Sequence, residues 1–180
     1  TSSPSDNTTL AGDETLTITD GSRVAAVGLT SGMSMSQIVN AINSELMAVH
    51  TQVLAGANQL YADSEQLAAI TAATKWNSIY NASGASANLD DDSTVSFTGV
   101  TNGGATVSGS YTIADVTTDS VQGLLSAIET VFGNQVTAEI DASGRIVVSD
   151  KTAGSSRLSC SLDMSLAHDL DFGSVASDNA

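Results

Sequence analysis

Few side chains in this sequence could carry out chemistry, and they lie far apart along the chain. The histidines are His50 and His168, and the single cysteine is Cys160. A thiolate nucleophile would need His168 to fold back onto Cys160. Cys160 alternates with Leu158 and Leu162, and this spacing places the three side chains on one face of a strand. We therefore expect a buried, inert thiol at this position.

The histidines lack partners at metal-ligand spacing. His50 follows a segment of helical apolar periodicity, where a positive imidazole would suit the negative end of the helix dipole. His168 stands in a weakly patterned tail. We expect structural or surface roles for both side chains.

Two acidic groups could bind calcium through their carboxylates. The first is the run Asp90, Asp91 and Asp92, and the second is the pair Asp169 and Asp171. Neither fits the spaced D-x-[DN]-x-[DN]-G loop or the nonapeptide calcium repeat, so we expect solvated loop charges. The sequence also contains no G-x-S-x-G, H-E-x-x-H or P-loop motif. No catalytic, cofactor-binding or metal-ligating residue is predicted, and we expect that the protein is not an enzyme.

Trp76 and Tyr80 are the aromatic pair that could serve as a platform for a sugar ring. Aromatic residues at this spacing more often form a small satellite core, because they bury a large apolar area. We favour the core. The platform remains the alternative, with the acidic loop at Asp90–Asp92 beside it.

The charge of the chain excludes several classes of partner. Its formal net charge is −15, from 20 acidic and 5 basic residues. Nucleic-acid binding and adhesion to anionic membranes both depend on clustered Lys and Arg, which are missing here. No apolar run is long enough for membrane insertion, and one cysteine allows no internal disulfide. The chain begins without an initiator Met or signal peptide, so we expect a fragment of a larger secreted protein.

The first half of the chain predicts a linker at 1–13 and a first α+β unit at 14–82. Residues 16–19 alternate with period two, a turn follows at 20–21, and 24–29 resume extended structure. Ser34 and Gln37 have capping-box spacing at the start of a helix. The helix has one apolar face, which we expect to lie on a sheet, formed by Met35, Ile38, Val39, Ile42 and Leu46.

The end of this unit is less regular. Short extended runs are expected at 51–54 and 59–62, and one or two short helices at 64–82, with Thr74 capping the second. Periodicity is then lost, and a connecting loop is predicted at 83–93.

The pattern restarts in a second α+β unit at 94–165, followed by a tail at 166–180. Strands are expected at 95–98 and 107–113, and Asp119 with Gln122 repeats the capping spacing. Gly133 stands where a C-terminal helix cap belongs. Three consecutive antiparallel strands are then expected at 136–140, 145–149 and 158–162. The apolar helical face is formed by Val121, Leu124, Leu125, Ile128 and Phe132.

The predicted fold class is therefore α+β, with two tandem β-β-α-β-β units. In each unit, mainly antiparallel sheets pack against one amphipathic helix. An internal duplication of this kind describes a building block rather than a catalyst.

Segments of both copies carry a resemblance to a known family. In the first copy they are LTITDG at 16–21 and MSQIVNAIN at 35–43. This order resembles the flagellin hook IN motif, a strand ending in a turn followed by a helix that closes on Ile-Asn. The first copy departs from the motif after His50. The matching segments of the second copy are VSFTG at 95–99, GSYTI at 109–113, LLSAI at 124–128, VTAEID at 136–141, SGRIVV at 143–148 and DKTAG at 150–154.

The resemblance implies an outer, surface-exposed structural region of a bacterial flagellar axial protein, most similar to the filament cap (hook-associated protein 2) family. Such a protein is extracellular, uses no cofactor, supports flagellin assembly and cell motility, and forms oligomers through its full-length chain. The implied partners are flagellin and other axial subunits, with no interface residue transferable to this sequence. The alternatives are a hook–filament junction protein, a flagellin variable domain, or an adhesin-like module that binds host glycan or mucin.

Overall fold

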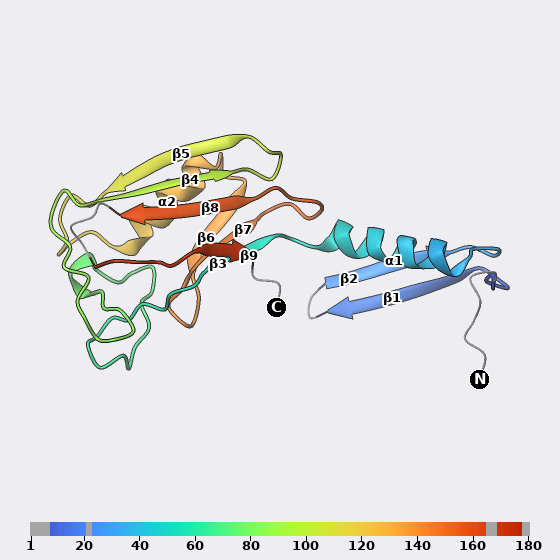
Figure 1. Ribbon diagram of the computed structural model, residues 1–180, viewed down its shortest axis with the longest axis horizontal. Coiled ribbons are helices and arrows are strands. Elements are labelled where there is room, and N and C mark those ends of the chain that lie inside the picture. The colour runs from blue at the N-terminus through green and yellow to red at the C-terminus, as the bar shows by residue number, and fades with distance from the viewer. Residues whose placement is uncertain (1–7, 21–22, 165–168, 178–180) are drawn as a thin grey trace. The chain divides into compact units, whose positions relative to one another are not determined.

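The computed structural model describes residues 8–20, 23–164 and 169–177 (Figure 1). Within these residues the fold is α+β, with two helices and nine strands in three antiparallel sheets. The chain divides into two compact units. Unit 1 comprises Thr1–Thr51 with Ala153–Ser155, and unit 2 comprises Gln52–Thr152 with Ser156–Ala180. The division therefore falls after Thr51 rather than in the loop expected at 83–93.

Unit 1 is a β-hairpin with one helix. Strands β1 (Glu14–Asp20) and β2 (Arg23–Leu29) pair antiparallel along their whole length, as the alternating pattern predicts. Helix α1 (Met35–Val49) contacts β2. The predicted capping box at its start is confirmed, because Ser34 Oγ accepts from the Gln37 amide at 3.4 Å and Gln37 Oε1 accepts from the Ser34 amide at 2.8 Å.

The apolar face of α1 is covered only in part. Met35 remains 40%, Val39 49% and Leu46 37% exposed, and no residue of the helix is buried. The expectation that a sheet would bury this face is therefore wrong for unit 1. Its hairpin has two strands, and the next strand along the chain belongs to unit 2.

Unit 2 contains two sheets. One has the order β6-β7-β3-β9, and the other has the order β5-β4-β8 (Figure 1). The first sheet thus takes in β3, and the final expected strand pairs with β4 rather than continuing from β7. The strands are β3 (Val53–Gly56), β4 (Thr94–Val100), β5 (Thr106–Thr112), β6 (Val136–Ile140), β7 (Ile146–Asp150), β8 (Ser159–Met164) and β9 (Val175–Ser177).

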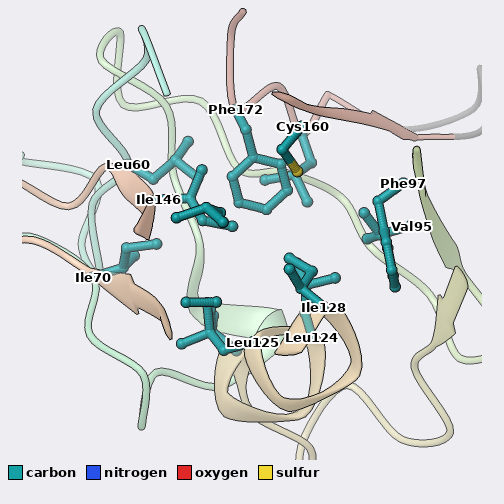
Figure 2. Packing of buried hydrophobic residues seen from close by; sticks show 14 of the residues in the cluster. Leu60, Ile70, Val95, Phe97, Leu124, Leu125, Ile128, Ile146, Cys160 and Phe172 are labelled. Atoms are coloured by element: carbon teal, nitrogen blue, oxygen red, sulfur yellow. The ribbon is translucent and has the colours of Figure 1, made fainter. Parts of the chain in front are cut away.

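Helix α2 (Val121–Val131) supplies the apolar face that was expected, and here it is fully buried. Figure 2 shows Leu124, Leu125 and Ile128 directed into the core, with Phe97 of β4 and Ile146 of β7 around them. Each such side chain contributes about 1.5–3 kcal/mol on burial, before conformational entropy is subtracted. The main apolar core of the protein therefore lies in unit 2.

The ends of α2 differ from the sequence pattern at one terminus. Ser120 precedes the helix without a side-chain cap, so the predicted Asp119–Gln122 capping box is wrong. Asp119 Oδ2 instead accepts from the amides of Ala114 and Asp115, at 2.9 and 3.3 Å. Gly133 follows the helix with φ of +64°, as a C-terminal cap requires.

The segment from 57 to 93 is mostly irregular. It contains only the 3₁₀ turn Trp76–Ser78, so the helices expected at 64–82 are absent, and Tyr61 makes isolated bridges where a strand was expected at 59–62. Thr74 caps no helix, since its Oγ1 accepts from the Thr71 amide at 2.8 Å. Asp63 organises the loop, accepting from the Leu67 and Ala68 amides. Short polar side chains here accept hydrogen bonds from backbone N–H groups that a helix or sheet would otherwise engage.

Candidate functional site

Cys160 lies on β8 and faces the core, as its alternation with Leu158 predicts. Figure 2 shows its sulfur among the core side chains near Phe172. Burial raises the pKa of the thiol to about 11, because the apolar surroundings disfavour the thiolate. The group therefore stays protonated at neutral pH and cannot act as a nucleophile. The proposed partner His168 lies outside the described residues.

His50 ends α1, as the sequence predicts. Its backbone amide donates to the Met47 carbonyl at 3.3 Å, and its own carbonyl accepts from the Gly154 amide at 2.8 Å. Both backbone groups thus take part in unit 1 structure. Across the part of the chain that the structure describes, no group of three or more His, Cys, Asp or Glu side chains could hold a metal ion.

The run Asp90–Asp92 forms the turn that enters β4. The Asp91 carboxylate accepts from the Val116 amide at 2.9 Å, and the Asp92 amide donates to the Ile113 carbonyl at 2.7 Å. Asp92 has φ of +66°, a left-handed conformation that Asp tolerates better than most residues. The run therefore organises loops.

Trp76 is buried in the main core of unit 2 and packs against Tyr111, with ring centroids 6.0 Å apart. The core interpretation of Trp76 is thus confirmed, although the core is not a satellite. Burial is the main cause that raises the pKa of Tyr111, and the carboxylate of Asp119 adds to it, while the Trp76 indole opposes it. Because the Trp76 side chain is buried, it cannot stack on a sugar ring.

Asp169 and Asp171 border a hollow of about 640 Å³ that also includes Asn58 and Asn81. Most polar groups of the hollow are used internally. Asp169 accepts from the Asn88 amide group at 3.0 Å, Asp171 accepts from the Gly173 amide at 2.7 Å, and Asn58 donates to the Asp171 carbonyl at 3.1 Å. These bonds hold loops together, so this hollow is a weak candidate for a ligand site.

The outward face of the β5-β4-β8 sheet is the more distinctive surface, and sequence reasoning missed it. Inward residues such as Val95 and Phe97 alternate with exposed Ser96 and Thr98 along β4. The same alternation operates in β5 and β8, so short hydroxyl side chains gather on one face. We call this the hydroxyl face; its members are Thr94, Ser96, Thr98, Thr106, Ser108, Ser110, Thr112, Ser159 and Ser161.

The register of the strands makes the hydroxyl face an ordered grid. Ser96 lies opposite Ser110, and Thr98 lies between Ser108 and Ser161. Neighbouring strands are about 4.8 Å apart, and side chains on one face repeat every ~6.7 Å along a strand. Each hydroxyl can donate and accept a hydrogen bond. The face therefore presents hydrogen-bond donors and acceptors at regular spacing across three strands.

Part of the hydroxyl face borders a hollow of about 510 Å³. Thr98, Thr106, Ser108, Ser159 and Ser161 contribute to its lining. The signal in the sequence was the alternation itself, in strands whose outward positions are almost all Ser or Thr. Its meaning depends on β8 pairing with β4, which the sequence pattern did not predict.

Comparisons with protein-family models, with curated proteins and with solved structures found no match for this chain. None of the described helices is both long and apolar enough to cross a membrane.

Proposed function

We propose that this chain is an outer, surface-exposed structural region of a bacterial flagellar axial protein, most similar to the filament cap family. The observation that carries the proposal is a hairpin followed by a helix, which occurs once as β1-β2-α1 and again as β4-β5-α2. These are the segments in which the sequence resembles the flagellin hook IN motif. The duplication that we propose is complete as β-β-α-β-β only in the second copy.

The chemistry of the described residues supports a structural role. The one thiol is buried and protonated, and the acidic run at Asp90–Asp92 is engaged in turns. The outer surface is rich in hydroxyl and carboxylate groups, and a net charge of −15 favours solubility over unspecific association. On this proposal the region gives the axial protein its bulk and outer shape, at an extracellular location on the flagellum.

An antibody raised against this chain tests the proposal directly. Immunogold electron microscopy of the source bacterium should show label at the filament tip. Label along the filament or at the hook–filament junction would instead identify flagellin or the junction protein as the parent class. Absence of label from flagella in cells that express the protein would refute the proposal.

Assembly provides a second measurement. Light scattering after size-exclusion chromatography should show that this chain is monomeric, while the axial protein that contains it forms a higher oligomer. An axial protein that stays monomeric under assembly conditions would contradict the proposed role in supporting flagellin assembly.

The hydroxyl face supports a second candidate, a module that binds host glycan or mucin. A glycan array should then show retained ligands, and Thr98→Val together with Ser161→Ala should weaken them at least tenfold, because each substitution removes a hydroxyl without adding bulk. Ser44→Ala, an exposed hydroxyl on α1, serves as the control. An array without hits would remove this candidate and leave the structural proposal unchanged.

A further inference from the structure

Unit 1 and part of unit 2 share one construction, which allows them to be compared position by position. Both contain two antiparallel strands of seven residues, fully paired, followed by a helix. Aligning the residues that face the helix places Leu16 of β1 on Val95 of β4, and Ile18 on Phe97. The helix residues align as Met35 on Val121, Val39 on Leu125, Ile42 on Ile128 and Leu46 on Phe132.

Equivalent residues differ strongly in exposure between β1-β2-α1 and β4-β5-α2. Val95 is 0% and Phe97 1% exposed, whereas Leu16 is 38% exposed and Ile18 is only partly buried. A contributing cause is the neighbourhood of the strand. Strand β4 lies between β5 and β8, whereas β1 pairs with β2 alone within the described residues (Figure 1).

We propose that the outer edge of β1 is a docking site for an extended segment of another polypeptide. This segment adds antiparallel to β1, in the place that β8 occupies beside β4. In unit 2, Phe97 of β4 lies opposite Leu162 of β8, and Gly99 lies opposite Cys160, so the apolar residues of β8 face the core. The occupant must therefore alternate apolar and polar residues, with its apolar side over Leu16 and Ile18.

The edge of β1 is built in a way that permits this addition. Its seven residues contain no Lys and no Pro, and the only charged residues, Glu14 and Asp20, stand at its ends. Lysine, proline and bulges are the devices by which proteins usually protect an exposed edge from pairing. Main-chain hydrogen bonds along such an edge provide affinity, and alternate side chains provide specificity.

The charge around β1 selects the kind of segment. Glu14 at the start of β1 is exposed, and the chain as a whole has 20 acidic residues against 5 basic ones. An occupant with basic residues at its ends would complement this arrangement, and an acidic one would be repelled. The net charge of −15 makes a second copy of this chain a poor occupant.

The comparison also distinguishes the two edges of the hairpin. The strand equivalent to β2 is β5, which forms the edge of its own sheet and has no further neighbour among the described strands. The strand equivalent to β1 is β4, which has β8. By comparison with the β5-β4-β8 sheet, the added strand therefore belongs beside β1. This site does not depend on the flagellar assignment, since it rests on the strand pairing and burial alone.

A peptide based on β8 is the probe. It carries the Leu158–Met164 alternation with Cys160→Ala and Asp163→Ser, and two lysines at each end. Its binding to the full 180-residue chain is measured by fluorescence anisotropy at low salt, with saturation expected in the micromolar range. Two further peptides are N-methylated at alternate backbone nitrogens. The two peptides differ in which alternate set of backbone N–H groups is blocked, and only one set can donate to β1. One methylated peptide should therefore lose binding at least tenfold, and the other should retain it.

Matched substitutions locate the site on the protein. Leu16→Asp should weaken peptide binding at least tenfold, because Leu16 faces the added strand. Val24→Asp should leave binding within about twofold, since Val24 is 55% exposed on the opposite face of the same hairpin. If Leu16→Asp does not fold, Leu46→Asp replaces it, because the equivalent Phe132 lies against Gly99 of β4.

The outcomes are decisive in both directions. Loss of binding with one methylated peptide and with Leu16→Asp, but not with Val24→Asp, supports the docking site. The proposal is overturned by no binding of the parent peptide, by equal binding of both methylated peptides, or by equal effects of Leu16→Asp and Val24→Asp. Light scattering that shows self-association lost in Leu16→Asp would also overturn it, because the occupant would then be a second copy.

Discussion

At the scale of single residues, the surroundings of a side chain decide whether it is reactive. Cys160 is the one thiol of the chain, and its place on the inner face of β8 removes it from chemistry. Glycines show the reverse case, since their missing side chain is what allows two elements to approach. Gly99 of β4 would place a Cβ against the Ser159 carbonyl oxygen and 2.7 Å from the Phe132 ring.

Cys160 should react with a thiol reagent far more slowly in the native protein than in urea. At pH 8 an unfolded thiol with a pKa of about 8.5 is partly ionised, whereas the native pKa is about 11, so the native rate should be lower by more than about 100-fold. The raised pKa contributes stability that is complete below the unfolded pKa and is lost as pH rises through about 9 to 11. Equal labelling rates in native and unfolded protein would contradict the buried placement.

Gly99→Ala should destabilise unit 2 by about 1–3 kcal/mol, because the new Cβ overlaps backbone and ring atoms that cannot move independently. Gly103→Ala is the control, since nothing lies within 4 Å of a Cβ at that position. Urea unfolding followed by Trp76 fluorescence measures both variants, because the indole is buried in the same unit. The packing would be misassigned if the two substitutions had the same effect.

At the scale of elements, the helices show how a local signal and its tertiary result can separate. Helix α1 has a complete capping box and a half-exposed apolar face, whereas α2 has no side-chain cap and a fully buried face. The stability of α1 should therefore depend more on its cap, and that of α2 on its packing.

Ser34→Ala should destabilise unit 1 by about 0.5–2 kcal/mol, because the substitution leaves the Gln37 amide without its side-chain acceptor. Ser44→Ala is a matched control within α1, where an exposed Ser→Ala change improves helix propensity by up to ~0.5 kcal/mol. Far-ultraviolet circular dichroism during thermal unfolding measures the helix. Equal melting of the Ser34 and Ser44 variants would count against the capping box.

At the scale of the whole molecule, two units with unequal cores share one chain. Buried apolar residues of unit 2 form the main cluster, whereas the buried apolar residues among the described part of unit 1 are Ala25, Val27 and Leu29. Cooperative units with few buried contacts open at lower free energy than well-packed ones. The two units should thus unfold in separate steps.

Hydrogen exchange tests this inequality. Backbone amides of α1 should exchange about 100-fold faster than those of α2, because opening unit 1 exposes much less apolar surface. Peptide-level mass spectrometry resolves the two helices, and binding of the strand peptide should slow exchange in β1 and α1 but leave exchange in α2 unchanged. Uniform protection of both helices would show a single cooperative unit.

Some elements of the fold could be predicted from local sequence pattern, and others could not. Ser34 with Gln37, the alternation in β1 and β4, and the five-residue faces of both helices were all predictable, because capping and periodicity depend on neighbours within a few positions. The turn-rich segment around Asp63 was not predictable, because side-chain hydrogen bonds to backbone amides hold it together and leave no periodic pattern in the sequence. Asp119 had the right spacing for a cap but was used by the loop at Ala114.

The sequence by itself determined that this is an α+β protein with a repeated hairpin–helix pattern and a buried, unreactive cysteine. Tertiary structure decided which strands are neighbours: β3 and β9 joined the β6–β7 hairpin, and β8 joined β4. Strand pairing depends on partners distant in sequence, which alternation alone does not specify. That pairing created the hydroxyl face in unit 2 and left the edge of β1 without a partner among the described strands.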